Sequence, residues 1–273
     1  LGSLIGPFLR EAGWHSAGVF GTLGATVAAA NMIRLDPPAT ICAMGIAASL
    51  ASGLSANIGS MVKPLHAGNS ARNGVLSAML AKRGFGSQPQ ALSGFLSAFS
   101  ANERMDEEAL TSTFARLGKP FDICYPGTDI KLYPSCNYTH PSIDAALDLL
   151  IDPNFSLSRL TSVNCTIGSL GRVLLRRPPL TGVEAKFSVE FCIACALTYG
   201  NVEVDHFCES EVERLSPLMR QVQVMERNPN VRDPQGGPAT LSIAFGGGSK
   251  IEATVNEPKG SVNNPLSIEE IDR

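Results

Sequence analysis

Residues 60–68, SMVKPLHAG, place a lysine and a histidine three residues apart around a proline. Pro64 disfavours helix at Lys63, so we expect one helix to end there and another to begin at Leu65. Lys63, His66 and the free N–H groups of the second helix would share one corner, which suits an anion such as a carboxylate. Two plainer interpretations stay open, with Lys63 facing the dipole in a last helical turn and His66 acting as a helix cap.

Two further segments carry side chains that could bind or transfer protons. His15 lies in GWHSAGVFG, at the start of an apolar helix, and could serve in proton transfer or simply cap or pack against that helix. The segment KLYPSCNYTH, just before an expected helix, contains Lys131, Tyr133 and His140. Such a loop could line a ligand cleft, or Lys131 could be an ordinary surface lysine. Cys136 in the same segment has no Cys–His–acid spacing that would favour a nucleophile.

Together these histidines and lysines suit acid–base chemistry on a small polycarboxylate. Lysines bind carboxylates as point charges, and histidines titrate near neutrality and transfer protons. The sequence contains no GxGxxG, Walker A or HExxH motif, so we expect neither a metal nor a cofactor.

The composition is that of a globular protein. The chain has 273 residues, of which 44% are hydrophobic and 17% charged, and its net charge of −3 argues against nucleic acid or an anionic membrane as a partner. Residues 17–33 are apolar but rich in Gly, Ala and Thr, which favours a buried helix over a membrane span. The seven cysteines have no framework spacing, and Cys192-x-x-Cys195 lies in an apolar helical run, so we expect buried, reduced thiols. No signal peptide is visible, and we expect a cytoplasmic protein, or a mitochondrial one if the source is eukaryotic.

The first part of the chain is predicted to be all helical. One helix is expected before Asp36-Pro37-Pro38 and one after it. Further helices are expected at residues 65–82, 91–99 and 106–117. After Lys119-Pro120 the pattern changes to short strands alternating with helices. Helices are predicted at 141–151, 184–197, 204–215 and 267–273, and extended segments at 129–133, 160–167, 218–226, 239–245 and 250–255. The last two flank Gly246-Gly247-Gly248, a hairpin signal.

Five ordered segments resemble the MmgE/PrpD family, which includes 2-methylcitrate dehydratases, cis-aconitate decarboxylases and an iminodisuccinate epimerase. The segments are GWHSAGVFGTLGATVAAA, CAMGIAASLASGL, MVKPLHAGNSARNGVLSAML, KLYPSCNYTHPSIDAAL and EAKFSVEFCIACAL. The resemblance covers nearly all of this chain, but the chain covers little more than half of a typical member.

The resemblance implies a mostly α fold with α+β, namely an all-helical domain and a smaller α+β lid, often dimeric, with a cofactor-free active site between the two. We therefore expect a partial helical domain at 1–125, a lid at 126–258, a return to the helical domain at 259–273, and a homodimer. The expected upstream helices of the family, with a further site histidine and aspartate, have no counterpart in this sequence.

By resemblance, the catalytic residues are His15, Lys63 and Lys131. His66, Tyr133 and His140 are predicted to bind substrate. Three departures are visible: Phe191 stands where the family often has tyrosine, and Asn69 and Asn137 stand where basic residues are common.

The main hypothesis is a cofactor-independent lyase, either a dehydratase or a decarboxylase, acting on a small di- or tricarboxylate such as 2-methylcitrate or cis-aconitate. An epimerase or racemase would need the same proton transfer without elimination. A truncated, inactive family member that only binds a ligand or dimerises is the alternative from a different class.

Overall fold

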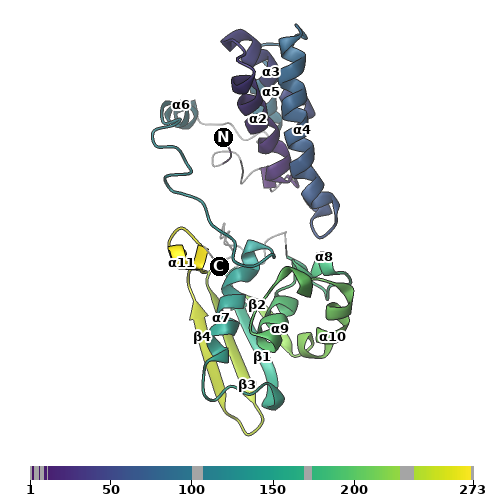
Figure 1. The fold of residues 1–273 in the computed structure, drawn as a ribbon, viewed down its shortest axis with the longest axis vertical. Coiled ribbons are helices and arrows are strands. Elements are labelled where there is room, and N and C mark those ends of the chain that lie inside the picture. Colours follow the sequence, from purple (N-terminus) through teal and green to yellow (C-terminus); the bar gives the residue numbers. More distant parts are fainter. Residues whose placement is uncertain are drawn as a thin grey trace. The chain divides into compact units, whose positions relative to one another are not determined.

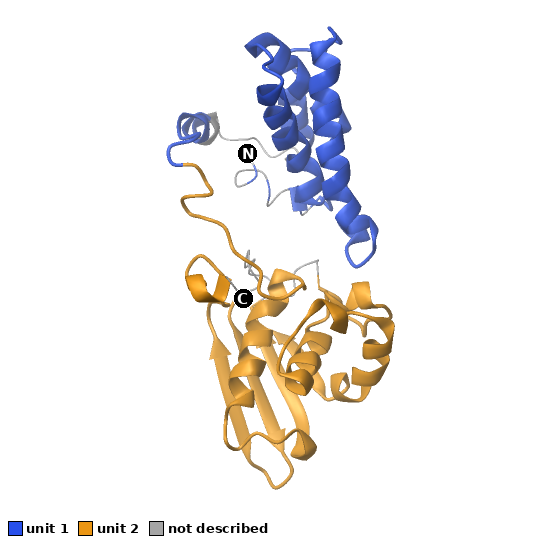
Figure 2. Cartoon of the chain, in the orientation of Figure 1, with its two compact units in different colours: residues 1–120 blue, residues 121–273 orange. Residues whose placement is uncertain are grey.

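The computed structural model describes residues 12–99, 107–168, 174–227 and 237–271, together with the isolated positions 2, 6, 9 and 10. The chain divides into two compact units, Leu1–Pro120 and Phe121–Arg273 (Figure 2). The described residues confirm a mostly α fold with an α+β part. The three-part domain division expected from the family stays a prediction.

Unit 1 is built from helices (Figure 1). They are α2 (Ser16–Met32), α3 (Pro37–Leu50), α4 (Val62–Lys82), α5 (Ala91–Phe99) and α6 (Glu107–Ala115), with a short 3-10 turn η1 (Ser55–Asn57) between α3 and α4. Helix α4 packs against both α2 and α3, and α5 packs against α3. Asp36 begins α3 because its side chain accepts a hydrogen bond from Ala39 N at 2.8 Å, which confirms the break predicted from Asp36-Pro37-Pro38.

Small residues allow α2 and α4 to approach closely. A Cβ atom added at Gly74 of α4 would lie 2.4 Å from the Cβ of Ala25 in α2, and one added at Gly21 would lie 2.7 Å from Ser70 Oγ. Only a hydrogen atom fits at Gly74, whose neighbours are a Cβ atom and backbone, whereas at Gly21 the Ser70 hydroxyl would have to turn away. In the part of the chain that the structure describes, no helix is long and apolar enough to cross a bilayer. Helix α2 buries one face, with Val19 and Leu23 in the core of unit 1, whereas Val27 and Met32 are exposed, so the helix predicted for residues 17–33 is only partly buried.

Unit 2 is a four-stranded sheet with helices packed on it. The strands are β1 (Leu160–Ile167), β2 (Val222–Glu226), β3 (Ala239–Phe245) and β4 (Lys250–Val255), in the order β2-β1-β3-β4. β1 pairs in parallel with β2 and antiparallel with β3, and β3–β4 is the predicted antiparallel hairpin. The helical elements are η2 (Asn137–Thr139), α7 (His140–Leu150), η3 (Leu157–Arg159), α8 (Gly182–Ala185), α9 (Val189–Tyr199), η4 (Val204–His206), α10 (Glu209–Met219) and α11 (Ile268–Ile271).

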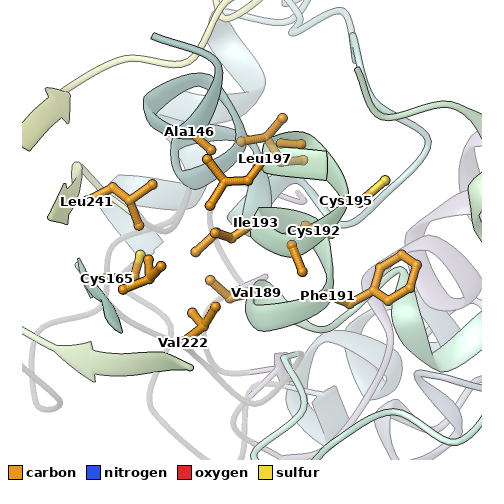
Figure 3. Close-up of a cluster of buried hydrophobic side chains, with 14 of the residues drawn as sticks. Ala146, Cys165, Val189, Phe191, Cys192, Ile193, Cys195, Leu197, Val222 and Leu241 are labelled. Atoms are coloured by element: carbon orange, nitrogen blue, oxygen red, sulfur yellow. The ribbon is translucent and has the colours of Figure 1, made fainter. Parts of the chain in front are cut away.

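The core of unit 2 lies between the sheet and helices α7 and α9. Helix α7 contacts β3 and β4, α9 contacts β2, and the two helices contact each other. Figure 3 shows Ile193 and Val189 of α9 among Ala146 of α7, Val222 of β2 and Leu241 of β3. Cys192 and Cys195 are fully buried in α9, as predicted.

Four local predictions for unit 2 are wrong. The expected helix at 184–197 is two helices, because Ser188 accepts a hydrogen bond from Phe191 N and starts α9 anew. The strand expected at 218–226 begins at Val222, since Leu218 and Met219 still belong to α10. The helix expected at 204–215 is the short turn η4 followed by α10.

The fourth error is the extended segment expected at residues 129–133, which joins no sheet. Ile130 N donates to Gly260 O at 2.8 Å instead. A Cβ atom at Gly260 would lie 2.2 Å from Ile130 O, and Gly260 also has a φ of +86°. This close contact ties the segment before η2 to the segment after β4, within unit 2.

Candidate functional site

A short antiparallel bridge positions His15 at the start of α2. Trp14 pairs with Leu54, His15 N donates to Gly53 O at 2.8 Å, and Ser55 N donates to Gly13 O at 2.8 Å. The backbone carbonyl of His15 accepts from Gly18 N in the first turn of α2. The side chain of His15 makes no capping bond, so the helix is begun by the backbone and the imidazole stays available for other contacts.

His66 lies against this bridge, on the buried face of α4. Its side chain is 9% exposed, and its ring packs where Gly53 has no side chain: a Cβ atom there would lie 3.2 Å from Cγ of His66. Gly53 also has a φ of +138°, a conformation that favours glycine. Nδ1 of His66 lies 3.0 Å from Nδ1 of His15, and the ring centroids are 5.2 Å apart.

Lys63 belongs to the first turn of α4, which begins at Val62. The prediction that a helix ends at Lys63 is wrong, because a proline is tolerated in the first turn, where its missing N–H is not needed. Lys63 is therefore not in a last turn, and His66, in the second turn, is not a cap.

The predicted corner of free backbone N–H groups is reduced at the start of α4. Val62 N donates to Ser60 Oγ and Lys63 N to Ser60 O, both at 3.2 Å, and Pro64 has no N–H. Because these two N–H groups are already used, side chains and the positive end of the α4 dipole are the main attraction for an anion here.

The local electrostatics favour a neutral His15. Burial lowers the pKa of His15, and the charges of His66 and Lys63 lower it further. A lowered pKa leaves the imidazole unprotonated at neutral pH, so that it is ready to accept a proton. The structure thus brings together three of the predicted residues, His15, Lys63 and His66, within unit 1.

The other three predicted residues lie in unit 2. Lys131 is exposed, and its Nζ donates to Ser135 O at 2.9 Å, which holds the lysine stem along the loop before η2. Tyr133 is buried, and its hydroxyl donates to Asp144 Oδ1 at 2.5 Å. Burial and the neighbouring Asp144 carboxylate raise the pKa of Tyr133, so its hydroxyl stays protonated.

Asp144 is a residue that the sequence reasoning missed. Besides accepting from Tyr133, its Oδ2 accepts from Lys259 N at 2.7 Å, so this one carboxylate connects the loop of Lys131 with the segment after β4. Burial raises its pKa, while these two hydrogen bonds act in the opposite direction. The available signal was the i, i+4 spacing of His140, Asp144 and Asp148, which places two acidic residues on the same side of α7 as His140.

His140 is 1% exposed at the start of α7. Its ring lies edge-on to Tyr133 with centroids 5.1 Å apart, and its Nε2 has no hydrogen-bond partner among the described residues. Burial, helped by the charge of Lys131, lowers its pKa to about 4, so the ring is neutral at neutral pH. Direct substrate contact by His140 stays a prediction, and the contacts seen here support the loop that carries Lys131.

The three departures from the family pattern differ in their surroundings. Phe191 is fully buried, with its ring 5.4 Å from that of Phe207. Asn69 is partly exposed on α4, and Asn137 Nδ2 donates to Asp129 Oδ2 at 3.5 Å. No group of three or more His, Cys, Asp or Glu side chains within the described ranges is arranged to hold a metal ion.

Comparisons with known proteins agree with these motifs. A family model described as the MmgE/PrpD C-terminal domain matches residues 133–273, and one described as the MmgE/PrpD N-terminal domain matches residues 4–108. A cis-aconitate decarboxylase of Aspergillus terreus is 27% identical over 98% of this chain and 58% of its own length. The human cis-aconitate decarboxylase is 28% identical over 77% of this chain and 43% of its own length, and the mouse protein is 26% identical over 94% and 54%. The chain thus spans little more than half the length of the Aspergillus relative, and it belongs to the MmgE/PrpD family.

Proposed function

We propose that this protein is a cofactor-independent lyase that removes water or carbon dioxide from a small di- or tricarboxylate such as 2-methylcitrate or cis-aconitate. The observation that carries the proposal is the grouping of His15, His66 and Lys63 at one end of the α2–α4 pair, in a chain of this family. The names of the relatives support an aconitate-like substrate.

Each reaction needs a proton carrier and a cation near carboxylates. In a dehydration, a base takes the proton next to a carboxylate while the C–O bond breaks and the hydroxyl leaves as water after taking up a proton. In a decarboxylation, the C–C bond to the carboxylate breaks, carbon dioxide leaves, and the electron pair left on carbon takes up a proton. In a dehydration, His15, neutral at rest, is proposed to accept the proton from carbon and to give it to the leaving hydroxyl. In a decarboxylation, His15 would first take up a proton from water and then donate it to carbon.

The lysines are proposed to bind the substrate's carboxylates. Lys63 is in the first turn of α4, where the helix dipole adds to the attraction for an anion. Lys131, held by Ser135, is proposed as a second carboxylate ligand, and positive charge at both positions would offset negative charge that builds up on the carboxylates during the reaction.

Product analysis by NMR tests this proposal. The protein is incubated separately with carboxyl-¹³C cis-aconitate, with 2-methylcitrate and with an epimerisable dicarboxylate. We expect carbon dioxide or an alkene, with a loss of roughly 10²-fold or more in kcat for His15→Gln. Inversion of a stereocentre without elimination would favour an epimerase, which uses the same proton transfer.

Binding measurements separate the lyase from an inactive member of the family. Calorimetry that detects binding of these acids, with no product found by mass spectrometry, would favour a non-catalytic protein. The buried Phe191, which lacks the hydroxyl that the family often has there, is the feature that would then explain the loss.

A further inference from the structure

The two imidazoles of unit 1 are close enough to require a shared proton. Nδ1 of His15 and Nδ1 of His66 are 3.0 Å apart, a normal hydrogen-bond length. A hydrogen bond between two ring nitrogens needs one donor and one acceptor, so one Nδ1 carries the proton and the other offers its lone pair. In the neutral pair, one ring must therefore be the Nδ1–H tautomer and the other the Nε2–H tautomer.

The rings are held in this position by the backbone around them. His15 is fixed by the bridge to Gly53 and by its place before α2, and His66 is fixed on the buried face of α4. Gly53 leaves room for the ring of His66, since a Cβ there would lie 3.2 Å from Cγ of His66. A Cβ at Gly18 would lie 2.2 Å from Ser52 O, so this glycine lets the start of α2 approach the segment that carries Gly53. Lys63 is the other charged group whose field acts on His15.

We propose that His15 and His66 form a one-proton dyad in which His66 sets the tautomer of His15 and receives its positive charge during turnover. The catalytic role of this dyad rests on the proposed function, and within it His66 is a positioning residue for His15. It adds to the prediction that His66 binds substrate, which stays a prediction.

The proton movements balance within the pair. When His15 is the Nδ1–H tautomer, its Nε2 is bare and accepts a proton from the substrate. The resulting imidazolium donates its Nδ1–H to His66 in a stronger, charge-assisted hydrogen bond. If that proton crosses to Nδ1 of His66, the charge moves to His66 and His15 is left neutral with a proton on Nε2. When His15 gives this proton to the leaving group, the proton on Nδ1 of His66 returns to Nδ1 of His15, which restores the starting pair. Two charged rings would direct two Nδ1–H groups at each other, so the dyad holds a single extra proton.

Histidine-selective ¹⁵N NMR of the whole chain tests the tautomers directly. The chain has four histidines, which keeps the spectrum simple. His206 is an internal reference, because its Nδ1 accepts a hydrogen bond from Glu203 N at 3.1 Å and its neutral form is therefore the Nε2–H tautomer. We expect His15 and His66 to show opposite tautomers in the neutral protein. The same tautomer in both rings would overturn the proposal, whether or not the protein has lyase activity.

Two substitutions of His66 then test the positioning role. His66→Asn keeps a short side chain that can hydrogen-bond to Nδ1 of His15, whereas His66→Leu removes the bond. We expect His15 to lose its wild-type tautomer in His66→Leu and to retain it at least in part in His66→Asn. We also expect kcat to fall roughly 10²-fold in His66→Leu with little change in KM, and to be partly rescued in His66→Asn.

The outcomes for the dyad and for the proposed function are distinguishable. Opposite tautomers without turnover of any tested acid would support the dyad and contradict the lyase. Turnover with an unchanged His15 tautomer and unchanged kcat in His66→Leu would support the lyase and overturn the dyad.

Discussion

Gly74 is the position where one methyl group should separate the two helices that carry the candidate site. In Gly74→Ala the new Cβ would lie 2.4 Å from Cβ of Ala25, 2.7 Å from the carbonyl carbon of Ala25 and 2.7 Å from Thr26 N. Cβ atoms are essentially never closer than 3.0 Å to such neighbours, so α2 and α4 must move apart by at least 0.6 Å. Because the neighbours are backbone and a Cβ atom, no side chain can swing away to relieve the clash.

The expected change in the free energy of unfolding is the difference between two opposing effects. Alanine is favoured over glycine by about 1 kcal/mol inside a helix. Overpacking of a close contact costs about 1–3 kcal/mol, and the lack of a flexible neighbour places this one toward the upper end. We therefore expect Gly74→Ala to lower the free energy of unfolding of unit 1 by about 1–2 kcal/mol.

Gly68 provides the matched control, since it lies in the same helix but is exposed and a Cβ there would meet nothing within 4 Å. Gly68→Ala should raise stability by about 1 kcal/mol through helix propensity alone. The difference between the two variants isolates the steric cost.

The assay is urea unfolding followed by tryptophan fluorescence. Trp14 is the chain's single tryptophan, and it packs in unit 1 against Phe99 with ring centroids 5.1 Å apart. Its emission therefore reports the unfolding of unit 1, and the shift in the urea midpoint gives the change in stability. Equal stabilisation by Gly74→Ala and Gly68→Ala would refute the close approach of α2 and α4.

Three further predictions concern unit 2. His140 has a pKa of about 4 in the folded protein against 6.5 for an unperturbed imidazole, so the unfolded state binds more protons between these pH values. The free energy of unfolding, measured by circular dichroism, should therefore rise from pH 4 to 6.5 by at most about 3 kcal/mol. An unchanged pH dependence in His140→Asn would contradict this. Tyr133→Phe should destabilise unit 2 by about 1–3 kcal/mol in a thermal melt, because it leaves the partly buried Asp144 without one donor, and an unchanged melting temperature would count against that bond. In the native protein, iodoacetamide should label the exposed Cys124 but not the fully buried Cys192 until urea unfolds unit 2, and mass spectrometry that finds both labelled equally fast would contradict the packing of α9.

Elements with a local start or stop signal could be predicted from the sequence. Asp36 with two prolines fixes the start of α3, and Gly246-Gly247-Gly248 fixes the β3–β4 turn through the positive φ values of Gly247 and Gly248. Where one residue type serves two purposes, the prediction was wrong. The sequence around Pro64 predicts a helix end, but Pro64 lies in a first turn. The apolar run around Ser188 predicts one continuous helix, but Ser188 begins a new one.

The contacts of the candidate site depend on residues far apart in the sequence, so periodicity could not reveal them. The types of His15, Lys63 and His66 indicated acid–base chemistry and carboxylate binding. Their juxtaposition depends on the Trp14–Leu54 bridge and on the close packing of α2 and α4. Asp144 was missed for the same reason, because its partners Tyr133 and Lys259 are set by the tertiary fold.

The most direct test of the central claim is a titration of the histidine-labelled protein with cis-aconitate, followed by NMR. The central claim is that His15 and Lys63 form a carboxylate site. We predict saturable shifts of the His15 and His66 resonances, none at His206, and at least tenfold weaker binding in Lys63→Ala. Resonances of His15 that stay unchanged at saturating ligand, or equal affinity in Lys63→Ala, would contradict the account.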